Sequence, residues 1–294
     1  NGGEPADEGT GTKDDPYKIK NAKQLYWAIN QGDKSVGKYY KLQNNIEITD
    51  TSVEDWEENA VNWVFPGGQS FRGHLDGDGF TVKGMLANGG NPALIPTVNS
   101  DDGEVTIENI GLEASVSRGT GNTAGALIGV TVGSHNVTVS CCYAAADVKI
   151  DSSDKVGLVA QVNGGNFTME NCFTLAEQSG GGANKADELY NGSLVGDVYG
   201  GNNAFDTVYI KNSYAVESPG YAAVCQNWSG ARCHFTNVYG TVEPKNDGKF
   251  YFWNLFGVKW VDKDKMTDES AISAMPGLDF ENVWMPIKGG FPKQ

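Results

Sequence analysis

The chain has 294 residues, and its 37 acidic side chains outnumber its 22 basic ones, which gives a net charge of −15 at neutral pH. This balance argues against nucleic acid or an anionic membrane as a partner, because both require a basic face. No apolar run approaches the roughly 18 residues that span a bilayer, so we expect a soluble chain without membrane insertion.

The N-terminal part reads as a tether followed by a cap. Residues 1–9 are acidic and rich in small side chains, as in a flexible tether. Asn21 is placed to cap a helix over 22–31, in which apolar residues recur at helical spacing before Gly32. Short strands and glycine-rich turns follow, so we expect residues 10–104 to form an N-terminal cap and the first coils of a repeat.

One strand pattern recurs between residues 105 and 242. Large apolar residues occupy its first and third places, and polar residues mostly fill the places between. This period of two sends alternate side chains to opposite faces of a strand. The copies start at Val105, Val137, Phe167, Val208 and Cys233. Their fifth place is Asn109, Cys141, Asn171, Asn212 and Asn237, in that order.

A second motif, with a leucine beside glycine, precedes most copies at a nearly fixed distance. It reads Gly125-Ala-Leu-Ile-Gly129, Gly157-Leu-Val-Ala160, Gly192-Ser-Leu-Val-Gly196 and Ala222-Ala-Val-Cys225. A constant internal offset, with length changes confined to polar loops, is how a solenoid stacks one unit on the next. The sequence therefore predicts an all-β fold, a single-stranded parallel β-helix that we expect to be right-handed.

Past the repeats, residues 243–294 are expected to form a C-terminal cap. A helix predicted over 267–275, with Thr267 as its N-cap, matches the helix over 22–31 at the other end. Such lids protect the terminal strands of a solenoid, which would otherwise pair with other molecules. We accordingly expect one solenoid domain over residues 10–294, monomeric, with short capping helices near both ends.

These motifs resemble those of bacterial surface proteins with GLUG-motif repeats, named for their glycine-leucine core. The resemblance rests on the glycine-leucine segments and on the Asn-Cys-Phe, Asn-Ser-Tyr and Asn-Val-Tyr triplets, in one order over residues 9–294. It implies a secreted or wall-attached bacterial module, often within adhesin-like proteins or appended to extracellular enzymes, and it implies no catalytic group. Two places depart from the pattern: Ala222-Ala-Val-Cys225 lacks the glycines, and Asn-Ile-Gly111 lacks the aromatic residue.

Two columns of repeated side chains each allow two interpretations. The asparagines could line a ligand groove, but stacked amides on successive coils more often form a ladder of hydrogen bonds, so we interpret Asn109, Asn171, Asn212 and Asn237 as a structural ladder. The aromatic column is expected to pack in the core or at a corner of the coils; it comprises Tyr143, Phe173, Tyr214 and Tyr239. Cys142 and Cys172 would lie at strand spacing, where we expect free thiols rather than a disulfide.

Metal-binding and catalytic motifs are sparse. Asp76-Gly-Asp-Gly79 invites a calcium interpretation, but the last position of a calcium loop would be Ala87 rather than Glu, so a Gly/Asp turn explains the segment better. We predict no metal site and no cofactor, with weak calcium binding left open. Glu108 and Glu170 share a column, yet alternate coils would place them about 10 Å apart, beyond the roughly 5–9.5 Å of a glycosidase pair. No catalytic residue is predicted.

Two aromatic residues are the best candidates for ligand binding. Tyr199 and Trp228 stand five residues after the repeat position of two neighbouring coils. If this column faces outward, the two rings offer flat apolar surface to a sugar or a protein. Packing at a corner of the coils is the alternative.

Function is therefore predicted at the level of a class. The primary hypothesis is a non-catalytic, extracellular or cell-surface adhesion module of a bacterium, which binds an extracellular glycan or a host or cell-wall protein through loops and corners. The alternatives are a carbohydrate-active enzyme of β-helix architecture, either a polysaccharide lyase or a glycoside hydrolase, and a structural spacer. A carboxylate pair with shifted pKa values would favour the enzyme, and an exposed aromatic patch would favour binding.

Overall fold

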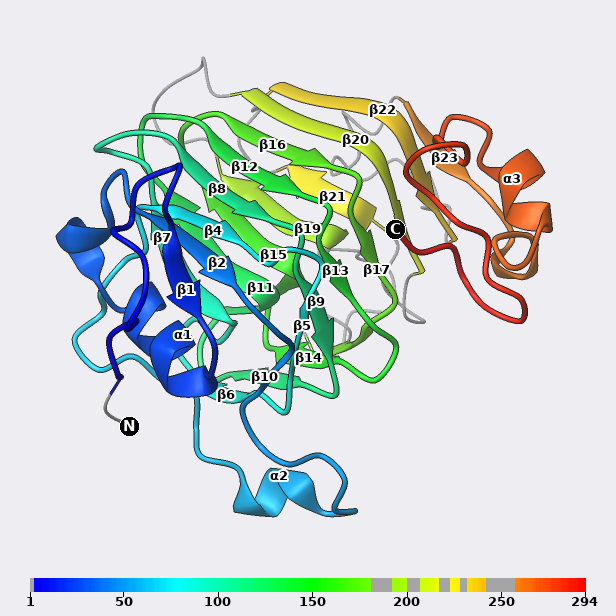
Figure 1. The fold of residues 1–294 in the computed structure, drawn as a ribbon. Coiled ribbons are helices and arrows are strands. Elements are labelled where there is room, and N and C mark those ends of the chain that lie inside the picture. Colours follow the sequence, from blue (N-terminus) through cyan, green and yellow to red (C-terminus); the bar gives the residue numbers. More distant parts are fainter. Residues whose placement is uncertain (1–2, 181–191, 200–206, 217–222, 228–231, 242–256) are drawn as a thin grey trace.

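The computed structural model describes residues 3–180, 192–199, 207–216, 223–227, 232–241 and 257–294. Over these ranges the chain winds into a β-solenoid whose coils are piled along one axis, from β1 to β23 (Figure 1). Neighbouring strands pair in parallel, as in the register of β8 with β12 and of β12 with β16. The predicted all-β parallel helix is confirmed.

The strands form stacks in which each coil adds one strand. The first stack holds β1 (Tyr17–Ile19), β2 (Tyr39–Leu42), β4 (His74–Asp76), β8 (Val105–Glu108), β12 (Val137–Ser140), β16 (Phe167–Glu170), β20 (Thr207–Ala215) and β22 (Arg232–Gly240). The second holds β3 (Ile46–Glu47), β5 (Thr81–Lys83), β9 (Gly111–Glu113), β13 (Tyr143–Ala144) and β17 (Phe173–Thr174), continued by the ends of β20 and β22 and by β23 (Val258–Trp260).

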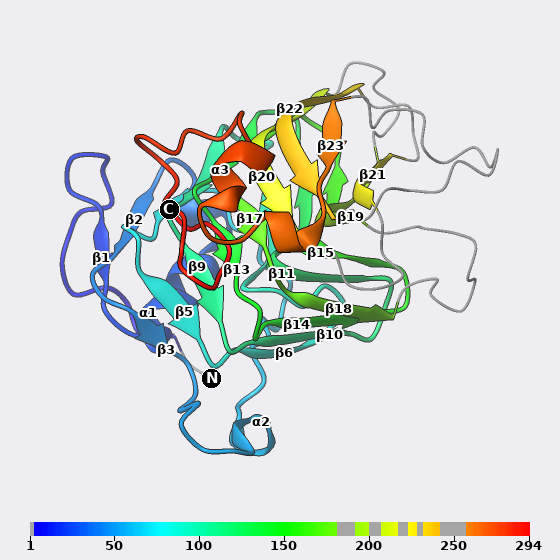
Figure 2. The same ribbon diagram turned by 90° about the vertical axis from the view of Figure 1, so that its right-hand side faces the viewer.

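Two further stacks close the tube. The third holds β6 (Leu86–Gly89), β10 (Val116–Gly119), β14 (Lys149–Ser152) and β18 (Glu177–Gly180). The fourth holds β7 (Ile95–Asn99), β11 (Thr123–Val132), β15 (Lys155–Asn163), β19 (Gly192–Tyr199) and β21 (Ala223–Asn227). Figure 2 shows the third stack as the lower wall of the tube. The helices are α1 (Ala22–Ile29), α2 (Trp56–Asn59) and α3 (Ser270–Ala274), with 3-10 turns η1 (Gly32–Ser35) and η2 (Lys263–Lys265).

Alternation along each strand fills the tube with apolar side chains. On β8, β12 and β16 the first and third residues are buried and the others are only partly covered. The buried ones stack coil upon coil as Val105, Val137, Phe167 and Val208, and as Ile107, Val139, Met169 and Ile210. Each such side chain contributes roughly 1.5–3 kcal/mol by leaving water, so the repeat pattern is the pattern of the core.

The asparagine column marks the corner between the first and second stacks. Asn109, Cys141, Asn171, Asn212 and Asn237 all adopt a left-handed backbone, with φ between 48° and 57°. Asparagine tolerates this conformation better than other residues with a Cβ atom. Their side chains point back along the axis: Asn237 Nδ2 donates to Asn212 Oδ1 at 2.9 Å, and Asn109 Nδ2 donates to Asp76 Oδ1 at 2.9 Å. The repeated asparagine therefore sets the turn as well as bonding between coils.

The glycines of the second motif accommodate close backbone contacts in the fourth stack. The pairing of β11 with β15 shifts register between Gly125 and Ile128. A Cβ atom on Gly129 would lie 2.5 Å from the carbonyl oxygen of Pro96, and one on Gly196 would lie 2.5 Å from that of Ala160. Neither position has room for a larger residue.

The aromatic column lies outside the tube, against the second stack. The rings of Tyr143, Phe173 and Tyr214 stack in parallel, with centroids 4.8 Å and 5.2 Å apart. Trp284 packs against Phe173 and Tyr214, and Tyr214 Oη donates to Pro292 O at 2.5 Å. The C-terminal segment thus buries this column completely at Phe173 and Tyr214. The expectation that the column serves packing is confirmed.

The first repeat has Gly111 in place of an aromatic residue because the ring of Tyr143, from the next coil, covers this position. A Cβ atom on Gly111 would lie 2.3 Å from the ring of Tyr143. The Tyr143 hydroxyl reaches past the glycine and donates to Glu113 Oε1 at 3.1 Å. The glycine therefore lets the aromatic stack end over the backbone of the preceding coil.

The ends of the solenoid are closed differently. Asn21 Oδ1 accepts a hydrogen bond from Gln24 N at 2.9 Å, so the predicted N-cap of α1 is confirmed, and the buried face of α1 joins the core. Thr267 is not the N-cap of the last helix. α3 begins at Ser270, after Glu269, and the Thr267 hydroxyl donates to Asp264 O at 3.2 Å instead.

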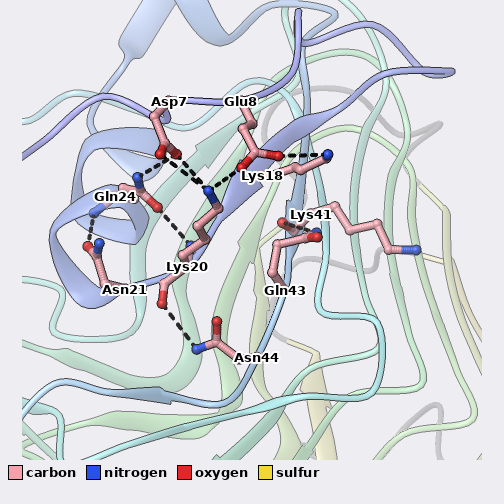
Figure 3. A network of polar contacts seen from close by, with 9 residues as sticks. All are labelled: Asp7, Glu8, Lys18, Lys20, Asn21, Gln24, Lys41, Gln43 and Asn44. Atoms are coloured by element: carbon pink, nitrogen blue, oxygen red, sulfur yellow. Dashed lines mark hydrogen bonds and ion pairs between the residues drawn. The ribbon is translucent and has the colours of Figure 1, made fainter.

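The acidic N-terminal segment lies along β1 and α1. Lys18 Nζ is 2.8 Å from Glu8 Oε2, and Lys20 Nζ contacts both Asp7 and Glu8 (Figure 3). Gln24 Nε2 also donates to Asp7. Residues 7 and 8 of the segment interpreted as a tether are therefore held by ion pairs. These pairs are exposed, so each adds little stability.

Four cysteines, Cys141, Cys142, Cys172 and Cys233, carry free thiols. Cys142 and Cys172 are fully buried in successive coils and carry free thiols, as expected. Burial raises the pKa of the Cys142 thiol well above its usual value. Buried neutral thiols of this kind act as small apolar side chains.

Candidate functional site

The outer face of the first stack carries two columns of polar and aromatic side chains. Because β4, β8, β12, β16, β20 and β22 pair in parallel register, equivalent residues line up along the axis. One column comprises Tyr39, His74, Thr106, Thr138, Thr168, Tyr209 and His234. The other comprises Lys41, Asp76, Glu108, Ser140, Glu170, Lys211 and Thr236. We call these two columns the outer face.

At one end of the outer face, an aromatic platform lies open to solvent. The ring of Tyr209 stacks on that of His234, with centroids 5.0 Å apart and planes 18° apart. Lys211 Nζ lies 5.5 Å from the centre of the Tyr209 ring. Tyr209 is 40% exposed, although its neighbours on the strand, Val208 and Ile210, are buried. An exposed flat ring beside a cation is a surface suited to stacking with a ligand.

A similar pair at the other end is more enclosed. The rings of Tyr39 and His74 stack with centroids 4.2 Å apart, and His74 Nδ1 is 3.0 Å from Thr106 Oγ1. Burial lowers the pKa of His74 below its usual 6.5, so the imidazole is neutral at pH 7. Between the two pairs run the threonines of β8, β12 and β16, which leave a row of hydroxyls on the surface.

Two carboxylates stand side by side on this face. Asp76 on β4 pairs directly with Glu108 on β8, at the roughly 4.8 Å spacing of adjacent strands. Asp76 accepts a hydrogen bond from Asn109 and lies 3.5 Å from Lys41 Nζ. Burial, together with the charge of Asp76, raises the pKa of Glu108. Asp76 is thus a carboxylate with bonding partners, while Glu108 holds its proton to higher pH. Acid–base catalysis uses two carboxyl groups whose pKa values differ in this way.

The Asp76-Gly-Asp-Gly79 segment is the end of a strand followed by a turn. Asp78 N donates to Asp76 Oδ1 at 2.8 Å, and Asp78 has a φ of 51°. Lys41 Nζ approaches Asp78 Oδ1 at 2.9 Å, so a lysine ammonium neutralises the turn. Among the residues described, no group of three or more metal-binding side chains comes together.

The predicted binding residues are only partly placed. Tyr199 ends β19, opposite Asn163 on β15, and is 52% exposed, so this ring faces solvent rather than packing at a corner. Trp228 lies outside the described residues. Glu108 and Glu170 stand on either side of Ser140, as the spacing predicted. Sequence reasoning missed Asp76, which it assigned to a turn, and the platform of Tyr209 and His234, although strand alternation places both outward.

The fourth stack contains a buried carboxylate. Asp197 is 1% exposed, its Oδ2 lies 3.7 Å from Lys155 Nζ and accepts a hydrogen bond from Gln161 at 3.4 Å. Its Oδ1 has no hydrogen-bond partner in the described part of the chain. Burial raises the pKa of Asp197 to about 6, against the lowering effect of Lys155. This acid is enclosed and is not part of the outer face.

Fold and surface together define an elongated parallel β-solenoid with one open face of polar and aromatic side chains. No helix in the described ranges is long and apolar enough to cross a membrane. No family model matches the chain, so the GLUG-repeat resemblance stays a prediction.

Two comparisons with known proteins relate to this class. The chain is 30% identical over 200 residues to halomucin of Haloquadratum walsbyi, a match that covers 67% of this chain but 2% of halomucin. A crystal structure from Bacteroides ovatus, provisionally described as an immunoglobulin A1 protease, superposes with a TM-score of 0.50 at 15% identity. That match covers 98% of this chain and 94% of the other, and it shows a shared fold.

Proposed function

We propose that this chain is a non-catalytic, extracellular or cell-surface interaction module that binds glycan along the outer face. The observation that carries the proposal is Tyr209, a ring left 40% exposed and stacked on His234 where the strand pattern would accept any polar residue. The alternating C–H groups of a sugar ring pack on such a surface, while threonine hydroxyls and carboxylates along the face bond its hydroxyls. Tyr199 is a second exposed ring, on the fourth stack rather than on the outer face.

The comparisons support an extracellular setting. Halomucin is a mucin by name, and the Bacteroides ovatus protein is described as a protease of an immunoglobulin. Both descriptions point to the outside of a cell. The acidic balance of the chain also suits a surface that binds neutral or weakly charged partners rather than polyanions. A role as part of a GLUG-repeat, adhesin-like surface protein is consistent with these features.

A glycan array tests this function directly. The intact chain is compared with Tyr209→Ala and Tyr199→Ala, and Ile272→Ala, an exposed apolar residue on α3, serves as the matched control. We expect the array signal to fall at least tenfold in Tyr209→Ala and to stay unchanged in Ile272→Ala. If no glycan is retained while a protein ligand is, the module binds proteins instead.

The pair of Asp76 and Glu108 favours a second candidate, a carbohydrate-active enzyme. Retaining glycosidases use two carboxyl groups about 5–5.5 Å apart, one of which holds a proton at working pH. Asp76 and Glu108 lie directly opposite each other on adjacent strands, and burial shifts the pKa of Glu108 upward, in the direction that the acid's role requires. An assay for new reducing ends, on neutral and acidic polysaccharides, decides: activity that disappears in Glu108→Gln would establish the enzyme, and no activity leaves the binding module.

A further inference from the structure

A separate pocket opens near the N-terminal end of the solenoid, away from the outer-face platform. Residues 63–69 cross the corner between β6 and β7 and enclose a space of about 230 Å³. Its apolar walls are Trp63, Phe65, Pro92 and Pro96. The space is smaller than the roughly 300–1,000 Å³ of pockets for drug-sized ligands, so it suits a single ring.

The aromatic wall of the pocket is rigid before any ligand binds. The Phe65 ring stacks on Tyr26 of α1 with centroids 4.5 Å apart, and the edge of Trp63 meets Phe65 at 5.6 Å. Trp63 Nε1 donates to Leu94 O at 3.0 Å, and Tyr26 Oη donates to Val64 O at 2.9 Å. Since these rings are already fixed, binding costs little ordering entropy.

The polar side chains of the pocket are three amides and the hydroxyl of Thr97, and none of them carries a charge. Asn88 Oδ1 is buried and has no hydrogen-bond partner in the part of the chain that the structure describes. The Asn62 side chain holds the Asn88 backbone through both its N–H and its C=O, at 2.7 Å and 3.0 Å. Asn88 Oδ1 is closed to solvent, whereas the Gln69 side chain is exposed and that of Asn91 is partly exposed. These two amides are therefore the groups that a ligand hydroxyl can reach.

From this geometry we propose that the pocket binds a neutral pyranose ring, the end or side branch of an extracellular glycan. The apolar face of the ring lies on Phe65 and Trp63, and its hydroxyls bond Gln69 and Asn91. The lining contains no ionisable side chain, so a charged sugar would be desolvated without compensation. The proposal stands on its own and does not depend on binding at Tyr209.

A neighbouring hollow extends the site to a second sugar. It has a volume of about 310 Å³ and is lined by Asn30, Gln31, Lys34 and Gln69, the last of which also borders the first pocket. Gln69 lies between the two spaces, and the second one adds the Gln31 amide and the Lys34 ammonium as hydrogen-bond donors. A disaccharide that crosses Gln69 would therefore reach polar side chains in both. We expect a disaccharide to bind at least tenfold more tightly than its terminal sugar alone.

The experiment measures binding of a defined panel by ligand-detected saturation-transfer NMR. The panel contains glucose, galactose, mannose, N-acetylglucosamine, their β-linked disaccharides, glucuronate and indole. Gly89→Leu fills the pocket: a Cβ atom there meets only Val64, at 3.9 Å, and the backbone is not left-handed, so the fold tolerates a side chain. Gly89→Ala is the matched control, and Gln69→Met removes the amide that borders both spaces at nearly constant size.

We expect at least one neutral sugar to bind, Gly89→Leu to weaken it at least tenfold, and Gly89→Ala to stay within about twofold. Gln69→Met should weaken binding while the melting temperature stays unchanged, because the Gln69 side chain is exposed. Tyr209→Ala should leave this site unchanged, which separates it from the outer face. Binding of none of the neutral sugars, preference for glucuronate or indole, or full binding in Gly89→Leu would overturn the proposal.

Discussion

Two aromatic columns run along the outside of this solenoid, and one is buried while the other is exposed to solvent. On the second stack, Phe173 and Tyr214 are fully buried because Trp284 and the C-terminal segment lie over them. On the first stack, Tyr209 stacks on His234 and stays 40% exposed. Ring stacking between coils is thus common to both columns. Only the cover separates a structural column from a surface available for binding.

The largest expected effect comes from removing that cover. Trp284→Ala deletes a side chain that is 2% exposed and touches both Phe173 and Tyr214, so we expect a loss of about 3–5 kcal/mol of unfolding free energy. Tyr209→Ala, on the open column, should cost less than about 1 kcal/mol. Urea denaturation of both variants measures the difference. Equal losses would contradict the distinction between the columns.

The next effect concerns the enclosed carboxylate of the fourth stack. The folded-state pKa of Asp197 is raised to about 6 from 3.8, so the native state binds more protons than the unfolded chain between these values. Stability should therefore fall as pH rises from about 4 to 6 and stay lower above it. Asp197→Asn should stabilise the protein at pH 7.5 by up to roughly 3 kcal/mol and have little effect below pH 4.

Denaturation midpoints measured at pH 3.5, 5 and 7.5 check this prediction. Gln161→Glu, on the neighbouring strand, is a useful companion because it adds a second acid beside Asp197 and should steepen the same pH dependence. If Asp197→Asn is destabilising at pH 7.5, the ion pair with Lys155 outweighs the cost of burial, and the predicted direction of the pH dependence is wrong.

Smaller effects are expected at the left-handed corner. Asn171→Ala places a less tolerant residue at a φ of 53° and should cost about 1–2 kcal/mol, whereas Asn171→Gly should be nearly neutral. Asn237→Gly also loses the bond to Asn212, so it should cost about 1 kcal/mol more than Asn171→Gly. Thermal unfolding of the four variants Asn171→Ala, Asn171→Gly, Asn237→Ala and Asn237→Gly separates backbone conformation from amide bonding. Identical behaviour of the two glycine variants would remove any role for the ladder.

The solenoid could be predicted from the sequence because the pattern of buried residues is visible within each short strand. Each strand shows its buried side through alternation, and the fixed offset between the two motifs shows that coils repeat. Asn109, Asn171, Asn212 and Asn237 align along one axis as that reasoning requires. Their shared left-handed conformation was not deduced, since asparagine is compatible with both a ladder and a turn.

The candidate surfaces were harder to predict because they depend on contacts between distant segments. Asp76 belongs to a strand because β2 and β8 pair with β4 on either side, and the adjoining glycines made a turn look sufficient. The pocket requires residues 63–69 to cross a corner formed more than twenty residues later, which no periodicity reveals. The start of α3 at Ser270 rather than after Thr267 likewise depends on a distant segment, because Asp268 has a left-handed backbone, with a φ of 54°, and its N–H donates to Gly290 O at 3.1 Å.

Hydroxyl-radical footprinting tests most directly whether the open column binds and the covered one only packs. In the free protein, Tyr209 and Tyr199 should be oxidised readily, while Phe173, Tyr214 and Trp284 should be protected. Saturation with a glycan selected on the array should protect Tyr209 and leave the covered column unchanged. Unchanged oxidation of Tyr209 in the bound state, or ready oxidation of Tyr214 in the free protein, would contradict the account.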